Sequence, residues 1–180
     1  MKDKIIELLK STERQGIDGL IKYMEDNGFF TAPCSGGFHL CKEGGLAEHS
    51  LNVFYKMLDV ATSLGFIYPS ITLSALLHDL GKASYHGKPN YVPNILTSGK
   101  VSTAKPYEIN KEILISDHAY KSCMIASKFI ELTEEEEFAI KYHNGLYEKS
   151  GYEILGKERP LQQLLLFADF WCSRFVEVEK

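Results

Sequence analysis

The 180-residue chain has few cysteines, and none of them stands in a CxxC spacing. Cys34, Cys41, Cys123 and Cys172 are too few and too scattered to build a disulfide framework, so we interpret them as reduced thiols of a cytoplasmic protein. Long hydrophobic runs are also missing, which excludes a membrane-spanning helix. The charged N-terminus MKDKIIELLKSTERQG lacks the apolar stretch of a signal peptide. The composition therefore predicts neither a disulfide-rich secreted domain nor a membrane partner.

Basic residues are not in excess either. The chain has 20 lysines and arginines against 24 aspartates and glutamates, a formal net charge of −4. A protein that binds nucleic acid along its surface usually carries a basic face or stripe. The charge balance therefore favours a small substrate, and a nucleic-acid end would need local attraction, for instance from metal ions.

Helical periodicity dominates the sequence. The segments that carry it are 5–24, interrupted near Gly16 to Gly19, then 46–64, 69–82, 117–132, 133–145 and 160 onward. Thr133 followed by Glu136 is a capping-box pattern, which predicts a helix start. Between Ala83 and Asn110 the chain is too long for a plain connection, and VSTAKPYEIN predicts a short hairpin or extended excursion around residues 90–110 that is typical of a lid. We predict an all-α helical bundle in one domain over residues 1–180.

Two aspartates stand where apolar neighbours predict burial. His78 and Asp79 follow the apolar run SALL on a buried helix, and Asp169 lies within LLLFADFWCSRF. Burying an unpaired, ionised carboxylate costs on the order of several kcal/mol. Arg174 follows Asp169 by five residues, a poor spacing for a helical ion pair. A divalent metal with mixed nitrogen and oxygen ligands would satisfy both aspartates at once.

The succession of His49, His78 with Asp79, and Asp169 resembles the H…HD…D signature of the HD superfamily. The contexts GGLAEHSLNV around His49 and LLHDLGK around the HD pair are similar to the first two motifs of that superfamily. The resemblance covers most of the chain, with a motif-bearing core over about residues 36–175. It implies a helical bundle with a metal site in its middle, and metal-dependent phosphohydrolase activity.

Two more histidines lie between the HD pair and the final aspartate, as in members of the superfamily that hold two metal ions. They are His118 in DHAYKS and His143 in KYHNG. By that resemblance His49, His78, Asp79 and Asp169 would hold the first ion, and His118 and His143 the second, with Asp79 bridging the two. The ions would be divalent transition metals such as Mn, Fe, Co or Ni. The paired histidines and GYP motif of cyclic-dinucleotide phosphodiesterases are absent, which disfavours that subfamily.

Three side chains are expected to take part in catalysis, namely Asp79, Lys82 and His39. Lys82 follows Asp79 by three residues, and it would bind a phosphate oxygen of the substrate or neutralise the C-terminus of its helix. The glycine turn at 44 and 45 would fold His39 over the metal face. There it would bind substrate or donate a proton, the alternative being a hydrogen-bonded structural histidine. His86, in the long excursion, would bind substrate as part of a lid or lie in a surface loop.

His39 also has a possible role in a different metal site. The stretch CSGGFHLC would allow a small zinc site from Cys34, His39 and Cys41. Because it offers only three ligands at loose spacing, this site is disfavoured.

The ligand set predicts a metal-dependent phosphohydrolase that acts on a nucleotide or another small phosphoester. Exonucleases of the HD type have similar motifs around GGLAEHSL, but they add an oligonucleotide-binding domain for which this chain has neither the length nor the charge. Two alternatives stay open. One is a di-iron oxygenase that cleaves a C–C or C–P bond with the same ligands, and the other is a nucleotide-sensing module without turnover. The sequence does not predict an oligomeric state.

Overall fold

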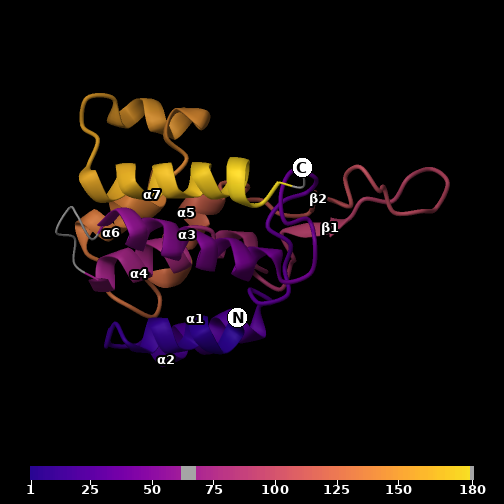
Figure 1. Cartoon of the computed structure of the whole chain (residues 1–180). Coiled ribbons are helices and arrows are strands. Elements are labelled where there is room, and N and C mark those ends of the chain that lie inside the picture. The colour runs from indigo at the N-terminus through magenta and orange to yellow at the C-terminus, as the bar shows by residue number, and fades with distance from the viewer. Residues whose placement is uncertain (62–67, 179–180) are drawn as a thin grey trace.

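The computed structural model of the chain describes residues 1–61 and 68–178. Over these residues helices dominate and the regular sheet has two short strands, which confirms the predicted all-α fold (Figure 1). The α-helices are α1 (Lys2–Lys10), α2 (Ile17–Asp26), α3 (Gly45–Ala61), α4 (Tyr68–Leu77), α5 (His118–Ala126), α6 (Glu134–Lys141) and α7 (Pro160–Trp171). Three 3₁₀ turns, η1 (Leu80–Lys82), η2 (Gly145–Tyr147) and η3 (Lys149–Ile154), and one π-helical turn, η4 (Cys172–Val176), connect or extend them.

The longer helices pack around one hydrophobic core. α3 contacts both α4 and α7, and α6 contacts α4, α5 and α7. In Figure 1, α7 lies above α3, and the pair α1 and α2 lies below α3 and α4, with α1 in contact with both. The interrupted periodicity of the first segment corresponds to this pair of helices. Its predicted inward residues are all buried: Ile5, Leu8, Leu9, Ile17, Leu20, Ile21 and Met24.

The start of α6 is fixed by the predicted capping box. Thr133 Oγ1 accepts from the backbone N–H of Glu136 at 3.2 Å, and Glu136 Oε2 accepts from the backbone N–H of Thr133 at 2.9 Å. The same buried carboxylate accepts from Arg14 Nη2 at 2.8 Å and from Ser70 Oγ at 2.8 Å. Burial acts to raise the pKa of Glu136, but the bonds from Arg14, Thr133 and Ser70 hold it below its usual value. One side chain thus ties the turn after α1, the start of α4 and the start of α6 together.

Two predicted helices end earlier in the structure than the sequence pattern indicates. The helix predicted to carry the HD pair, α4, ends at Leu77. His78 and Asp79 therefore lie in the turn between α4 and η1 and not on the helix. The segment predicted as a helix over 117–132 is helical only to Ala126, with Asp117 as its N-cap. The predicted end of the helix over 46–64 falls on residues outside the described ranges.

The excursion around residues 90–110 forms the predicted hairpin. β1 (Tyr91–Pro93) pairs antiparallel with β2 (Tyr107–Ile109), and Figure 1 shows the connection between them extending away from the bundle. The backbone N–H of Tyr107 donates to Gly36 O at 3.1 Å, which docks the hairpin on the loop that carries His39. The four cysteines are free thiols, as predicted. No helix in residues 1–61 and 68–178 is long and apolar enough to cross a membrane.

Candidate metal centre

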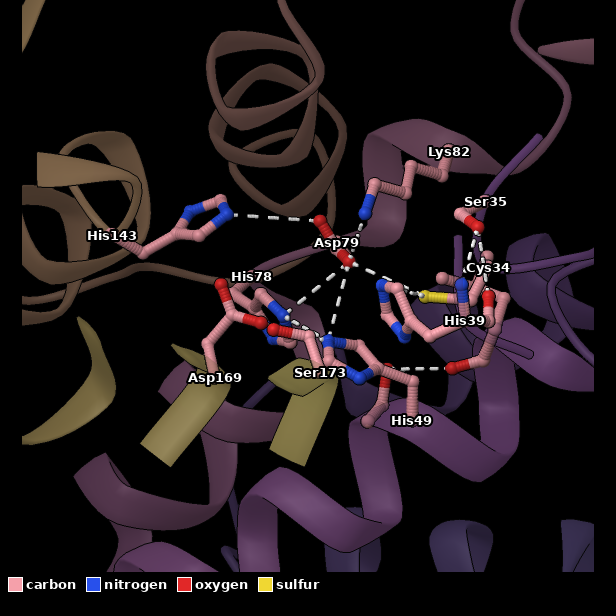
Figure 2. A network of polar contacts seen from close by, with 12 residues as sticks. Cys34, Ser35, His39, His49, His78, Asp79, Lys82, His143, Asp169 and Ser173 are labelled. Carbon is pink, nitrogen blue, oxygen red and sulfur yellow. Dashed lines mark hydrogen bonds and ion pairs between the residues drawn. The ribbon is translucent and has the colours of Figure 1, made fainter. Parts of the chain in front are cut away.

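The six predicted ligands converge on one region of the bundle interior. His49 lies on α3, His78 and Asp79 follow α4, His118 begins α5, His143 follows α6, and Asp169 lies on α7. Figure 2 shows the side chains of His49, His78, Asp79, His143 and Asp169 pointing toward one another from these separate elements. Most of the ligands are fully buried, while the side chains of His118 and Asp169 are each 20% exposed.

Two glycines allow the close approaches that build this centre. A Cβ on Gly81, in η1, would lie 2.1 Å from the carbonyl oxygen of His118, so glycine is needed for α5 to pack against the HD turn. A Cβ on Gly45, the first residue of α3, would lie 2.1 Å from Leu40 O. The loop that holds His39 therefore lies directly on the helix that holds His49.

The first predicted ligand set is tightly grouped. His49 Nε2 lies 3.2 Å from His78 Nε2, 3.1 Å from Asp169 Oδ1 and 3.6 Å from Asp79 Oδ2. His78 Nε2 lies 3.4 Å from Asp79 Oδ2. Ligands held about 2.1 Å from a shared ion stand about 3.0 to 3.4 Å apart, so these spacings fit one divalent ion.

The second predicted set faces the other oxygen of the same aspartate. His118 Nε2 is 3.3 Å and His143 Nε2 is 3.7 Å from Asp79 Oδ1. This oxygen is buried and has no hydrogen-bond donor within the described part of the chain. A buried carboxylate oxygen without a donor is costly, and a cation between it and the two imidazoles would remove that cost.

Hydrogen bonds at Nδ1 of His49, His78 and His143 show that their Nε2 atoms are free to bind a metal. His78 Nδ1 donates to Ala75 O at 2.8 Å, and His143 Nδ1 donates to Ile140 O at 2.7 Å. Because a carbonyl can only accept, each neutral ring must carry its proton on Nδ1 and present the Nε2 lone pair to the interior. His49 presents its Nε2 in the same way, since its Nδ1 lies 2.9 Å from a carboxylate oxygen of Glu177.

The electrostatics of the centre call for added positive charge. Burial lowers the pKa of His118 to about 3 and that of His143 to about 4, so both rings are neutral at pH 7. Burial also acts to lower the pKa of His49, but surrounding negative groups, including Asp169 and Glu177, raise it well above its usual value. A proton on His49 thus adds positive charge beside the carboxylates of Asp169 and Glu177. Metal binding at this position would displace that proton.

Lys82 is the charged partner of Asp79 within the chain. Its Nζ donates to Asp79 Oδ2 at 2.6 Å, and its side chain is 15% exposed. Burial alone would lower the pKa of Lys82, but Asp79 raises it well above its usual value, so the ammonium stays charged. This contact places the ammonium at the edge of the ligand cluster. It does not test whether Lys82 binds a phosphate oxygen or neutralises the end of its helix, so both roles stay predictions.

His39 lies beside the centre and is held on both sides. Its Nδ1 lies 2.7 Å from Glu177 Oε2, and its Nε2 lies 3.9 Å from the sulfur of Cys34. That sulfur is also 4.0 Å from Asp79 Oδ2, and burial raises the pKa of the Cys34 thiol to about 12. The geometry groups Cys34 and His39 with His49 as potential ligands, whereas the sulfur of Cys41 lies against Ser35 Oγ at 3.2 Å. The roles of His39 in catalysis and substrate binding stay predictions.

Glu177 is a residue of the centre that the sequence did not single out. Its buried carboxylate accepts from His39, from His49 and, at 2.9 Å, from Asn52 Nδ2. Burial acts to raise the pKa of Glu177, but these bonds lower it to about 2. No local pattern in FVEVEK marks this glutamate. Asn52 follows His49 by three residues on the same helix, a spacing that could have marked the face that Glu177 contacts.

Two cavities lie beside the centre. One, of about 160 Å³, is lined by Asn144, Asp169, Ser173 and Arg174 together with apolar side chains, and it reaches a predicted metal ligand directly. The other, of about 620 Å³, is lined by His39 and Glu177 but by none of the six predicted ligands. Of these two cavities, the smaller one is lined by a predicted metal ligand, Asp169.

His86 lies away from both of these cavities. It is exposed, its ring centroid is 4.2 Å from that of Tyr85, and it borders a separate apolar cavity with Lys88 and Leu114. Its predicted contact with substrate stays a prediction.

Comparison with known families agrees with the geometry of the centre. A family model described as HD domain matches residues 46–169, more than half of the chain, and this range takes in all six predicted ligands. Comparisons with curated proteins and with solved structures gave no match. The buried groups of histidine and aspartate are consistent with an HD-type metal site. The chain therefore belongs to the HD domain family.

Proposed function

We propose that this HD domain protein is a metal-dependent phosphohydrolase that acts on a nucleotide or another small phosphoester at a two-ion site. The HD domain itself places the chain in a superfamily of metal-dependent hydrolase type. We propose in addition that the substrate is a phosphoester and that the site holds two ions of Mn, Fe, Co or Ni. We also propose a cytoplasmic location, with which the free thiols agree.

The observation that carries the proposal is the position of Asp79 between two pairs of imidazoles. Its Oδ2 faces His49 and His78, at 3.6 and 3.4 Å, and its Oδ1 faces His118 and His143, at 3.3 and 3.7 Å. Each oxygen thus faces its own pair of imidazole nitrogens, so Asp79 would be able to hold both ions. When bound, a pair of divalent ions would supply Lewis acidity, which makes water a nucleophile at neutral pH and offsets the charge of a phosphoryl group.

The chain's own residues would supply orientation and charge. Lys82 is positioned to add positive charge where a phosphate oxygen approaches Asp79, because its ammonium is held there at 2.6 Å and is partly exposed. His39 would bind substrate or donate a proton from the side of the larger cavity, which it lines, while Glu177 holds its Nδ1. Burial of His49, His78 and His143 keeps bulk water from competing for the ligand atoms.

Release of phosphate tests the proposal. The purified protein, loaded in turn with Mn²⁺, Co²⁺, Fe²⁺ or Ni²⁺, is assayed against a panel of nucleotides and simple phosphomonoesters. We expect hydrolysis of at least one substrate, and we expect Asp79→Asn to abolish it. Asp59→Asn is the matched control, because Asp59 is exposed and pairs with Lys56 on the surface of α3.

The outcomes of this assay separate the competing functions. Activity with Mn²⁺ or Ni²⁺ under anaerobic conditions would exclude the di-iron oxygenase. Substrate-dependent consumption of O₂ by the iron-loaded protein, without phosphate release, would contradict the phosphohydrolase. Nucleotide binding that survives removal of metal, without turnover, would support a sensing module instead.

A further inference from the structure

An irregular turn brings Arg174 to the smaller cavity, which Asp169 also lines. The backbone N–H of Glu177 donates to Cys172 O at 3.0 Å, an i to i+5 bond that widens the last turn after α7 into the π-helical turn η4. In a regular α-helix, residues five apart do not share a face. Here Asp169 and Arg174 line the same cavity, because the wider turn carries Arg174 round toward Asp169.

The guanidinium of Arg174 lies against aromatic rings. Its Cζ lies 4.3 Å from the ring centroid of Phe38 and 5.6 Å from that of Phe170. Among residues 1–61 and 68–178 no acidic side chain forms an ion pair with it, although Asp169 lines the same cavity. A cation restrained by ring faces keeps its N–H donors, which lie in the guanidinium plane, available to a ligand.

The polar groups beside Arg174 also suit an anion. Asn144 and Ser173 line the same cavity, and Asn144 Nδ2 lies 3.3 Å from His118 Nε2. The cavity therefore combines a guanidinium, an amide and a hydroxyl with one carboxylate, Asp169, which is a predicted metal ligand. An anion placed there would be adjacent to the metal centre.

An aromatic surface continues from this anion-sized cavity. The rings of Tyr147 and Phe170 stack with centroids 5.8 Å apart and an interplanar angle of 28°. Both residues also line a neighbouring, mostly apolar hollow of about 300 Å³ together with Leu166 and Phe167. Tyr147 is 71% exposed, so its ring is accessible to a ligand from solvent.

We propose that Arg174 binds the phosphate of the substrate, and that the stacked rings of Tyr147 and Phe170 bind a planar leaving group. This assignment rests on the proposed phosphohydrolase activity and extends it by a substrate-binding residue. The phosphate would lie between Arg174 and Asp169, and the guanidinium would position it by paired hydrogen bonds. Arg174 is thus a positioning residue whose loss weakens substrate binding more than turnover.

Kinetics and phosphate inhibition of the Mn²⁺-loaded protein test this role. For Arg174→Gln we expect the KM of the best phosphomonoester and the inhibition constant of inorganic phosphate to rise about tenfold to a hundredfold, with a smaller change in kcat. Arg174→Lys keeps the charge but loses the planar fork, so we expect an intermediate rise. Arg159→Gln, which removes an exposed arginine at the other end of α7, should leave both constants unchanged.

A second variant tests the aromatic surface separately. Tyr147→Ala should raise the KM of a nucleoside monophosphate severalfold and leave that of glycerol phosphate unchanged, because only the nucleotide has a ring to stack. Equal effects on the two substrates would contradict this half of the proposal.

Failure of the inference and failure of the proposed function give different results. If the wild-type protein hydrolyses phosphoesters but Arg174→Gln keeps KM and phosphate inhibition within twofold, the inference is wrong and the function stands. If no substrate is hydrolysed, calorimetry with inorganic phosphate replaces the kinetics, and Arg174-dependent binding would uphold the inference alone. A folded Arg174→Gln protein that changes only its melting temperature or its oligomeric state would mean that Arg174 is structural, and would overturn the assignment.

Discussion

We predict that the carboxylate of Glu177 controls metal affinity at the first ligand set, although Glu177 is not one of the six predicted ligands. It accepts from His49 Nδ1 at 2.9 Å, which fixes the His49 proton on Nδ1 and leaves Nε2 for the metal. The perturbation is Glu177→Gln, which keeps the shape of the side chain. The amide presents an NH₂ group to His39, His49 and Asn52, all of which donate to the carboxylate in the wild-type protein.

The size of the effect follows from the role of an outer carboxylate. Loss of such a partner costs about 10-fold to 100-fold in metal affinity, equivalent to about 1.4 to 2.7 kcal/mol. Because Glu177 contacts no ligand of the second set, we expect only the site containing His49 to weaken. Asn52→Leu removes one contact but leaves the bond to His49, so its loss should be smaller.

The assay is a titration of metal-free protein with Mn²⁺ against a competing chelator. Glu43→Gln is the control, since Glu43 is an exposed carboxylate close to the start of α3. Melting temperatures in the presence of chelator show that each variant is folded. An affinity of Glu177→Gln within twofold of wild type at both sites would refute the proposed link between Glu177 and His49.

Three further predictions concern the surroundings of the centre. Lys82→Met leaves Asp79 buried without its ammonium partner, so the free energy of unfolding in urea should fall by about 3 kcal/mol in metal-free protein and by less with Mn²⁺. An equal fall in both forms would contradict this. Gly81→Ala places a methyl group against His118 O, so it should lower the free energy of unfolding by about 2 kcal/mol and the metal content by one ion per chain. Unfolding curves and metal analysis measure the two effects, and unchanged values would show that the contact is not tight. The pKa of Glu136 is lowered, so its contribution is present above the usual value of 4.5 and is lost as pH falls through the folded value. The stability gap between wild type and Glu136→Gln should shrink as pH falls from about 6 to 3, and a constant gap would contradict the assigned shift.

Features set by neighbouring residues could be predicted from the sequence. The capping box at Thr133 and Glu136 and the helix start at Pro160 both depend on contacts within a few residues, and both occur in the structure. The apolar residues of the first two helices are buried because their spacing leaves one face for the core. The HD motifs likewise identified a family that the comparison confirms.

Features set by contacts between distant segments could not be predicted in this way. Glu177 meets His49 across 128 positions of the chain, and nothing near Glu177 indicates that contact. Within the described ranges Arg174 forms no ion pair with Asp169, as its spacing predicted, but nothing in the sequence indicated the π-helical turn that brings both residues to one cavity. The turn that holds His78 was predicted as helix because the apolar pattern runs on to Leu80, past the last helical residue, Leu77.

We propose that Asp79 bridges two divalent ions. A crystal structure of the Mn²⁺-loaded protein with anomalous scattering tests this most directly. We predict two anomalous peaks, one between Asp79 Oδ2 and the pair His49 and His78, the other between Asp79 Oδ1 and the pair His118 and His143. A single peak that does not contact Asp79, or no peak near these residues at saturating Mn²⁺, would contradict the two-ion site and the phosphohydrolase mechanism proposed from it.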